Sequence, residues 1–199
     1  LLSSEKIAQY NTPSTLSFAA LVAGTGVAYD IEIVKLTYNT ALESGDIVEA
    51  SGTISFPKNK TGASPLLSYQ HATIFFNDSV PSNDPLFDFT PAYAATGGFV
   101  VVAPDYIGYG ASNSKTHPFI QSVPTANSVI DLIRAARVFA AEEGVNLNNQ
   151  LFLAGYSEGA YASMAAHQRM ETYHADEFTV TGSVIGSGPY DARGTVDDM

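Results

Sequence analysis

The stretch that decides the fold reads Leu151-Phe152-Leu153-Ala154-Gly155-Tyr156-Ser157-Glu158-Gly159-Ala160-Tyr161. An apolar run ends at Gly155, a serine stands two residues later, and an alanine-rich helical pattern follows Gly159. This Gly-x-Ser-x-Gly pattern between a strand and a helix is typical of a nucleophilic serine on a sharp turn. The glycines let strand and helix approach closely. The pattern predicts that Ser157 is a nucleophile at a helix N-terminus, where backbone amides favour an oxyanion.

The composition indicates a globular chain and excludes several classes of function. The 199 residues are 45% hydrophobic and 15% charged, and their number suits one core. A net charge of -11 argues against nucleic acid or anionic lipid as a partner. The absence of cysteine excludes disulfides, thiolate zinc sites and cysteine nucleophiles. No apolar run approaches the ~20 residues of a transmembrane helix. No acidic cluster has metal-ligand spacing, so we expect no metal and no other cofactor.

Apolar patterns along the chain predict strands that alternate with helices. Two alternating segments, 31–38 and 47–56, flank a turn and predict an antiparallel hairpin. Further strands are predicted over 65–71, 99–103, 150–154 and 178–186, and helices over 16–22, 87–95, 129–140 (ending at Gly144) and 158–173. This order predicts the α/β fold class, with a mostly parallel sheet and helices on both faces. We expect residues 1–199 to form one incomplete core domain.

Four separate stretches together resemble one family. They read Ser68-Tyr69-Gln70-His71-Ala72-Thr73, Ala103-Pro104-Asp105-Tyr106-Ile107-Gly108-Tyr109-Gly110, the Ser157 turn, and Gly188-Pro189-Tyr190-Asp191. Together they resemble the secretory lipases and esterases related to Candida lipase A, within the α/β-hydrolase superfamily. The resemblance runs from about Ile31 to the end and covers the N-terminal half of such an enzyme. Where that family usually has His-Gly, this sequence has His71-Ala72.

The resemblance implies a serine carboxylic-ester hydrolase, an esterase or lipase, that acts through an acyl-Ser157 intermediate. Its substrate would be a small neutral acyl ester, and the protein would be secreted or periplasmic. The backbone N–H of Glu158 is one expected oxyanion donor, because the residue after the nucleophile has this role in the fold. A second amide is expected from Ala72 or a neighbour. His71 and Tyr156 are candidate lining residues of the site.

The sequence lacks a histidine that fits the role of catalytic base. In this fold the acid and then the histidine follow the nucleophile. His167 would lie ~15 Å along the helix that begins after Ser157, and His174 further still, because a helix rises ~1.5 Å per residue. His71 and His117 precede the serine, and we expect them to be loop residues. We therefore expect a second polypeptide or a C-terminal segment to supply the Asp and the His, together with the cap and the last strands.

Two aspartates lie near the ends of predicted strands. Asp105 follows a strand and is expected to order the loop after it. Asp191 is either a catalytic acid at the end of the last strand or a turn aspartate.

A serine peptidase of the same fold stays an alternative function, because the turn around Ser157 does not distinguish esters from amides. A non-catalytic relative of the α/β-hydrolases is the other alternative, which the missing histidine permits.

Overall fold

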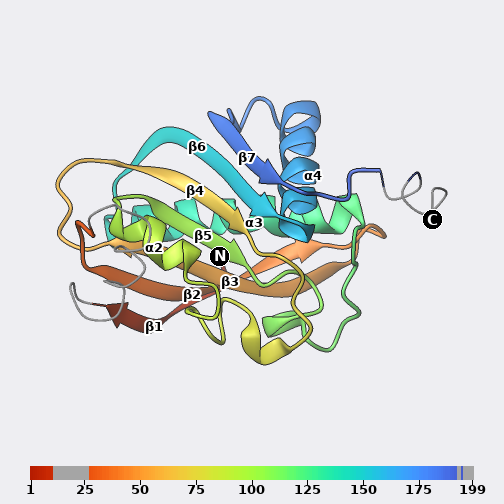
Figure 1. Cartoon of the computed structure of the whole chain (residues 1–199), viewed down its shortest axis with the longest axis horizontal. Coiled ribbons are helices and arrows are strands. Elements are labelled where there is room, and N and C mark those ends of the chain that lie inside the picture. The colour runs from red at the N-terminus through yellow and green to blue at the C-terminus, as the bar shows by residue number, and fades with distance from the viewer. Residues whose placement is uncertain (11–26, 192–193, 195–199) are drawn as a thin grey trace.

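The computed structural model describes residues 1–10, 27–191 and 194. Seven strands of this part form one sheet in the order β1-β2-β3-β5-β4-β6-β7 (Figure 1). They are β1 (Ser3–Tyr10), β2 (Ile31–Ala41), β3 (Ile47–Pro57), β4 (Ser64–Gln70), β5 (Val100–Pro104), β6 (Leu147–Tyr156) and β7 (Gly182–Gly186). Strands β5, β4, β6 and β7 pair in parallel. The helix predicted over 16–22 lies outside the described residues.

The predicted hairpin is confirmed as β2 and β3. The two strands pair antiparallel without a break, from Ile31 opposite Pro57 to Ala41 opposite Ile47. The turn between them closes with a hydrogen bond from the Leu42 N–H to the Asp46 carbonyl, 2.9 Å long. Strand β3 also pairs antiparallel with β5 and so joins the hairpin to the parallel strands.

Strand β1 is a structural element that the sequence pattern did not predict. Its residues do not alternate cleanly, and the pairing with β2 shifts register between Lys6 and Ala8. Antiparallel hydrogen bonds to β2 form the strand, and Lys6 Nζ lies 2.6 Å from Glu32 Oε2 across the pair. Tertiary pairing rather than local pattern therefore fixes β1.

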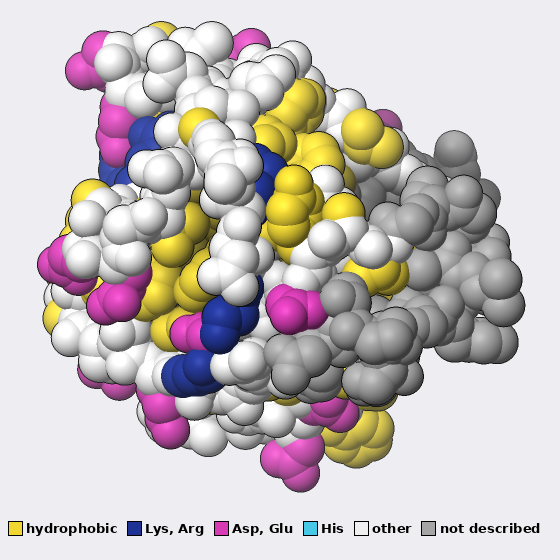
Figure 2. All heavy atoms as spheres, turned by 90° about the vertical axis from the view of Figure 1, so that its left-hand side faces the viewer, with side chains coloured by type: hydrophobic (Ala, Val, Ile, Leu, Met, Phe, Trp, Pro, Cys, Tyr) yellow, Lys and Arg dark blue, Asp and Glu magenta, His cyan; other side chains and the backbone are white. Residues whose placement is uncertain are grey.

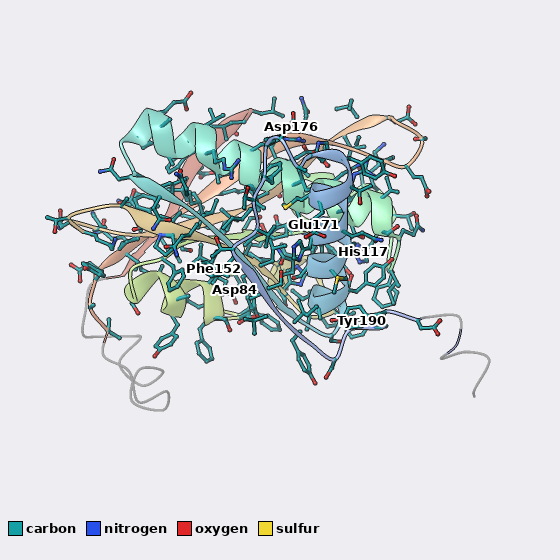
Figure 3. The ribbon with its side chains drawn as sticks, turned by 90° about the horizontal axis from the view of Figure 1, so that it is seen from above. Asp84, His117, Phe152, Glu171, Asp176 and Tyr190 are labelled. Carbon is teal, nitrogen blue, oxygen red and sulfur yellow. The ribbon has the colours of Figure 1, made fainter. Side chains whose placement is uncertain are left out.

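Helices cover both faces of the sheet, as predicted. Helices α3 (Ser122–Glu143) and α4 (Glu158–Tyr173) pack on one face, and α2 (Thr90–Thr96) packs on the other. Figures 1 and 3 show α2 and α3 on opposite sides of the sheet. All of β5 is buried: Val100 and Val102 join the core under α3 and α4, and Val101 joins the core under α2. Burial on both faces explains why β5 reads as a continuous apolar run.

Several element boundaries differ from the prediction. Helix α2 begins at Thr90 rather than at Phe87, and Pro91 lies in its first turn, where proline is tolerated. Helix α3 begins at Ser122, earlier than predicted, and ends as expected before Gly144, which has the left-handed conformation (φ 70°). Strand β7 begins at Gly182, not at Phe178, because Phe178 lies in a turn and packs into the core. Two short 3-10 helices, η1 (Asn77–Ser79) and η2 (Gly110–Ser112), complete the described elements.

The two ends of the parallel strands differ in character. Figure 2 faces the left-hand side of Figure 1, from which β4, β5 and β6 start, and shows hydrophobic and charged side chains but no histidine in view. At the sheet edge, β7 leaves Val184 77% exposed. Across the described ranges, no helix combines the length and the apolar character needed to cross a membrane. Strand β6 ends at Tyr156, so the predicted nucleophile Ser157 lies at the opposite end of the sheet, where the parallel strands finish.

Candidate active site

Ser157 lies on a strained turn between β6 and α4. Its backbone has φ 56° and ψ -121°, a combination that side-chain-bearing residues rarely adopt. Such a conformation costs about 1–3 kcal/mol and persists where the surroundings hold it. Here the Ser157 N–H donates to the Gly186 carbonyl (2.9 Å), and the Ser157 carbonyl accepts from Ala160 (3.0 Å) and Tyr161 (3.2 Å). Strand β7 and the first turn of α4 thus hold the turn from both sides.

The two glycines of the turn are required by close backbone contacts. A Cβ at Gly155 would collide with the Gly159 carbonyl and would lie 2.9 Å from Ala160 N. A Cβ at Gly159 would collide with the Gln70 carbonyl and would lie 2.7 Å from the His71 carbonyl oxygen. Helix α4 therefore begins in direct contact with the end of β6, as the glycine spacing predicted, and also with the end of β4, which it did not.

The Gly159 contact yields a stability prediction. We expect Gly159→Ala to lower the free energy of unfolding of the full-length protein by about 1–3 kcal/mol, because the added methyl meets fixed backbone atoms. Chemical denaturation measures this change. Gly182→Ala is the matched control, because a Cβ there would lie an ordinary 3.7 Å from Phe152. Equal losses in the two variants would contradict the close-contact explanation.

The predicted oxyanion residues lie beside this turn. Glu158 opens α4, and amides of the first helical turn have no acceptor within the helix. Ala72 follows β4 by two residues, and β4 pairs with β6 up to Gln70 opposite Gly155. Ala72 has no positive φ, so alanine is accommodated here without strain. The structure thus brings the Ala72 segment and the Glu158 amide together at the carboxyl ends of β4 and β6, beside the Ser157 turn.

The two predicted lining residues have different surroundings. Tyr156 is 60% exposed directly before Ser157. His71 is buried, its Nδ1 lies 2.7 Å from the Ala72 carbonyl oxygen, and its Nε2 has no partner. Burial lowers the pKa of His71, so the ring is neutral. The His71 ring packs against Tyr106 at 4.3 Å between centroids, and Tyr106 donates a hydrogen bond to the His71 carbonyl. His71 is therefore part of the interior under the site.

His117 lies in the loop between η2 and α3, as expected, and its ring also reaches the first residue of α4. Its Nε2 lies 2.7 Å from Glu158 Oε1, and its Nδ1 lies 2.8 Å from the Ile107 carbonyl oxygen. Figure 3 shows His117 beside α4. Both ring nitrogens are occupied, so neither is available to Ser157 Oγ. Sequence reasoning missed this pair because 41 residues separate its members, and only the fold brings them together.

The two histidines that follow Ser157 bind elsewhere, in agreement with the prediction. His167 Nδ1 lies 3.0 Å from Ser183 Oγ on β7, and His174 ends α4 with Nδ1 3.4 Å from Arg134. Within residues 1–10, 27–191 and 194, no histidine forms a hydrogen bond with Ser157 Oγ. The described residues thus form the turn predicted to carry the nucleophile, without a histidine hydrogen-bonded to its hydroxyl.

The two predicted aspartates both bind backbone amides. Asp105 is fully buried and accepts hydrogen bonds from Ser51 Oγ (2.5 Å) and from the Ser82 N–H (2.9 Å). This agrees with its expected role in ordering loops. Asp191 Oδ1 accepts the Gly194 N–H at 2.8 Å, a bond that a turn aspartate makes. Among the described residues, no three His, Asp or Glu side chains lie together in a way that could hold a metal ion.

Solved structures resemble this chain over almost all of its length. A protein from Legionella pneumophila aligns with a TM-score of 0.84 at 27% identity, over 94% of this chain and 52% of its own. A mutant of the rice cell wall degrading esterase LipA from Xanthomonas oryzae aligns at 0.83 and 31% identity, over 95% and 50%. Lipase A from Candida antarctica shares the fold at 0.69 and 22% identity, over 98% and 44%. The chain thus spans about half the length of these proteins.

The comparisons identify both fold and family. The sheet order and the aligned structures establish the α/β-hydrolase fold that the sequence predicted. A comparison with curated proteins gives no match. The family model for secretory lipases matches residues 90–198, which is more than half of the chain and includes the Ser157 turn. The chain belongs to the secretory lipase family.

Proposed function

We propose that this chain is the nucleophile-bearing half of a serine carboxylic-ester hydrolase, an esterase or lipase. The observation that carries the proposal is the backbone of Ser157, which holds a strained positive φ between a parallel strand and a helix N-terminus. Such strain is retained where it serves a function. Family membership and the esterase and lipase neighbours support the same reaction class.

In this mechanism, Ser157 Oγ attacks the ester carbonyl carbon and forms an acyl-enzyme. A base takes the hydroxyl proton, the alcohol leaves with a proton, and water then releases the acid. The developing oxyanion accepts hydrogen bonds from the N–H of Glu158 and from an amide at Ala72. Each such donor contributes about 3 kcal/mol to the stability of the transition state. Tyr156, exposed next to Ser157, would contact the substrate.

The base and the acid that orients it come, in this proposal, from a segment C-terminal to this chain or from a second polypeptide. Two observations support this. The aligned structures are about twice as long as the chain, and no histidine among the described residues is hydrogen-bonded to Ser157 Oγ. The supplied histidine would approach Ser157 from the open side of β7, where Val184 is exposed.

The substrate we propose is a neutral acyl ester, cleaved outside the cell. The net charge of -11 disfavours anionic substrates. The family is that of secretory lipases, and one aligned protein is an esterase that degrades rice cell walls. These points support secretion and an uncharged ester.

Activity assays with the full-length protein test this proposal. We expect hydrolysis of p-nitrophenyl acyl esters, no cleavage of matched peptide anilides, and inactivation by a fluorophosphonate probe. Faster turnover of the anilides would favour a serine peptidase. Absence of both turnover and labelling would favour a non-catalytic member of the fold, the alternative that the missing base in the described residues permits.

A further inference from the structure

A buried carboxylate stands directly beside the proposed oxyanion site. Glu158 is 3% exposed, although its backbone N–H is the proposed donor to a developing negative charge. A buried carboxylate is unfavourable unless it is paired. Its charge would also repel an oxyanion at its own amide, because charges interact strongly where water is excluded. A positive charge next to the Glu158 side chain would offset both penalties.

His117 provides that charge through its two hydrogen bonds. The Ile107 carbonyl oxygen, 2.8 Å from Nδ1, accepts only, so Nδ1 carries a proton. The 2.7 Å contact between Nε2 and Glu158 Oε1 holds one further proton, and with that proton on Nε2 the ring is an imidazolium beside a carboxylate. Burial opposes the charged ring, but the hydrogen bonds to Glu158 and Ile107 and the charge of Glu158 together raise the pKa of His117. The raised pKa favours the imidazolium, and in that form the ring neutralises Glu158.

The groups that face His117 leave this pairing intact. The ring packs against Tyr109 at 5.0 Å, Tyr106 at 6.0 Å and Phe119 at 6.1 Å between centroids. Burial raises the pKa values of Tyr106 and Tyr109, which keeps both phenols neutral. Burial lowers the pKa of His71, on the far side of Tyr106, so that ring is also uncharged. Glu158 is therefore the charged side chain that His117 contacts among the described residues.

The loop after β5 fixes the position of His117. Gly108 has φ 95°, and a Cβ there would lie 2.5 Å from the Cα and 2.6 Å from the backbone N of His117. Tyr109 in the same loop donates a hydrogen bond to the Ile74 carbonyl, in the segment that follows Ala72. The loop thus contacts both the segment of the second proposed oxyanion amide and, through His117, the side chain of Glu158.

We propose that His117 is a positioning residue that neutralises Glu158 and ties the oxyanion amide of Glu158 to the loop after β5. This inference rests on the proposed function, because it assigns a role in the same ester-hydrolysis site. His117 acts through Glu158 and does not touch substrate. Its removal leaves an unpaired carboxylate beside the oxyanion, and removal of that carboxylate as well relieves the repulsion.

Four variants of the full-length protein test the inference on a p-nitrophenyl ester. We expect His117→Ala to lower kcat about tenfold or more, with little change in KM, since oxyanion stabilisation is a transition-state effect. The double variant His117→Ala/Glu158→Gln should recover most of that loss, and Glu158→Gln alone serves as the reference for the pH profile. His174→Ala, at the far end of α4, is the matched histidine control and should leave kcat unchanged. Thermal unfolding of each variant checks its fold.

The pH profile gives a second readout that a merely structural role would not move. Wild-type kcat should fall as pH rises through the raised pKa of His117, above the ordinary value of 6.5, because the neutral ring no longer compensates Glu158. In Glu158→Gln this alkaline fall should be absent. An unchanged kcat in His117→Ala, or a double variant as slow as His117→Ala, would overturn the inference. Either result can occur while activity still depends on Ser157, which separates this inference from the proposed function.

Discussion

Replacing Ser157 with alanine in the full-length protein is expected to reduce ester hydrolysis by about 10⁶-fold in kcat. Only Oγ is lost, and the hydrogen bonds that hold the turn come from backbone groups: the Ser157 N–H to Gly186 and the Ser157 carbonyl from Ala160 and Tyr161. The fold and its thermal stability should therefore stay close to wild type. Turnover of a short-chain p-nitrophenyl ester, with circular dichroism of the same sample, measures both.

Ser44→Ala is the matched control for this prediction. Ser44 lies in the exposed turn between β2 and β3, where its Oγ donates to Asp46 Oδ2 at 2.8 Å. Loss of this hydroxyl should leave the rate unchanged. More than a trace of wild-type turnover in Ser157→Ala, with Ser44→Ala fully active, would show that another residue is the nucleophile.

Residues 1–199 expressed alone are expected to be inactive and poorly soluble. Strand β7 is an edge strand of the described sheet, and an open apolar edge invites pairing with other chains. Val184 on this strand is 77% exposed. Co-expression with the proposed C-terminal segment or second polypeptide should restore solubility and ester hydrolysis together. Sedimentation and turnover of the two preparations, with and without that segment or polypeptide, measure this.

The opposite outcome has a clear structural meaning. A monomeric, soluble chain of residues 1–199 that hydrolyses esters would contradict the proposal that the base lies elsewhere. The base would then have to be His71 or His117. For His117 this would require the bonds to Glu158 and to Ile107 to be broken, because both of its ring nitrogens are occupied.

The elements that the sequence predicted correctly are those with strong local patterns. The continuous apolar run of β5 indicated burial on both faces, and the glycine spacing around Ser157 indicated the sharp turn. Helix α3 was recognised from its apolar periodicity and from Gly144 at its end. In each case the signal lies within the segment that forms the structure.

The features that the sequence did not reveal depend on contacts between distant segments. Strand β1 forms by pairing with β2, including the ion pair of Lys6 with Glu32, and has no clear alternation of its own. Phe178 was assigned to β7 because it is apolar, but it packs into the core from a turn. The pairing of His117 with Glu158 arises only when the loop after β5 meets α4. Such contacts leave no periodic trace in a single sequence.

The most direct test of the account is the mass of the reaction intermediate. Rapid acid quenching of the full-length protein during turnover of a p-nitrophenyl ester should trap one acyl group per chain, because acyl transfer to serine precedes hydrolysis. Peptide mapping is predicted to locate that acyl group on Ser157, and Ser157→Ala should carry none. An acyl group on a different residue, or ester turnover in which Ser157 stays unmodified at every quench time, would contradict the account.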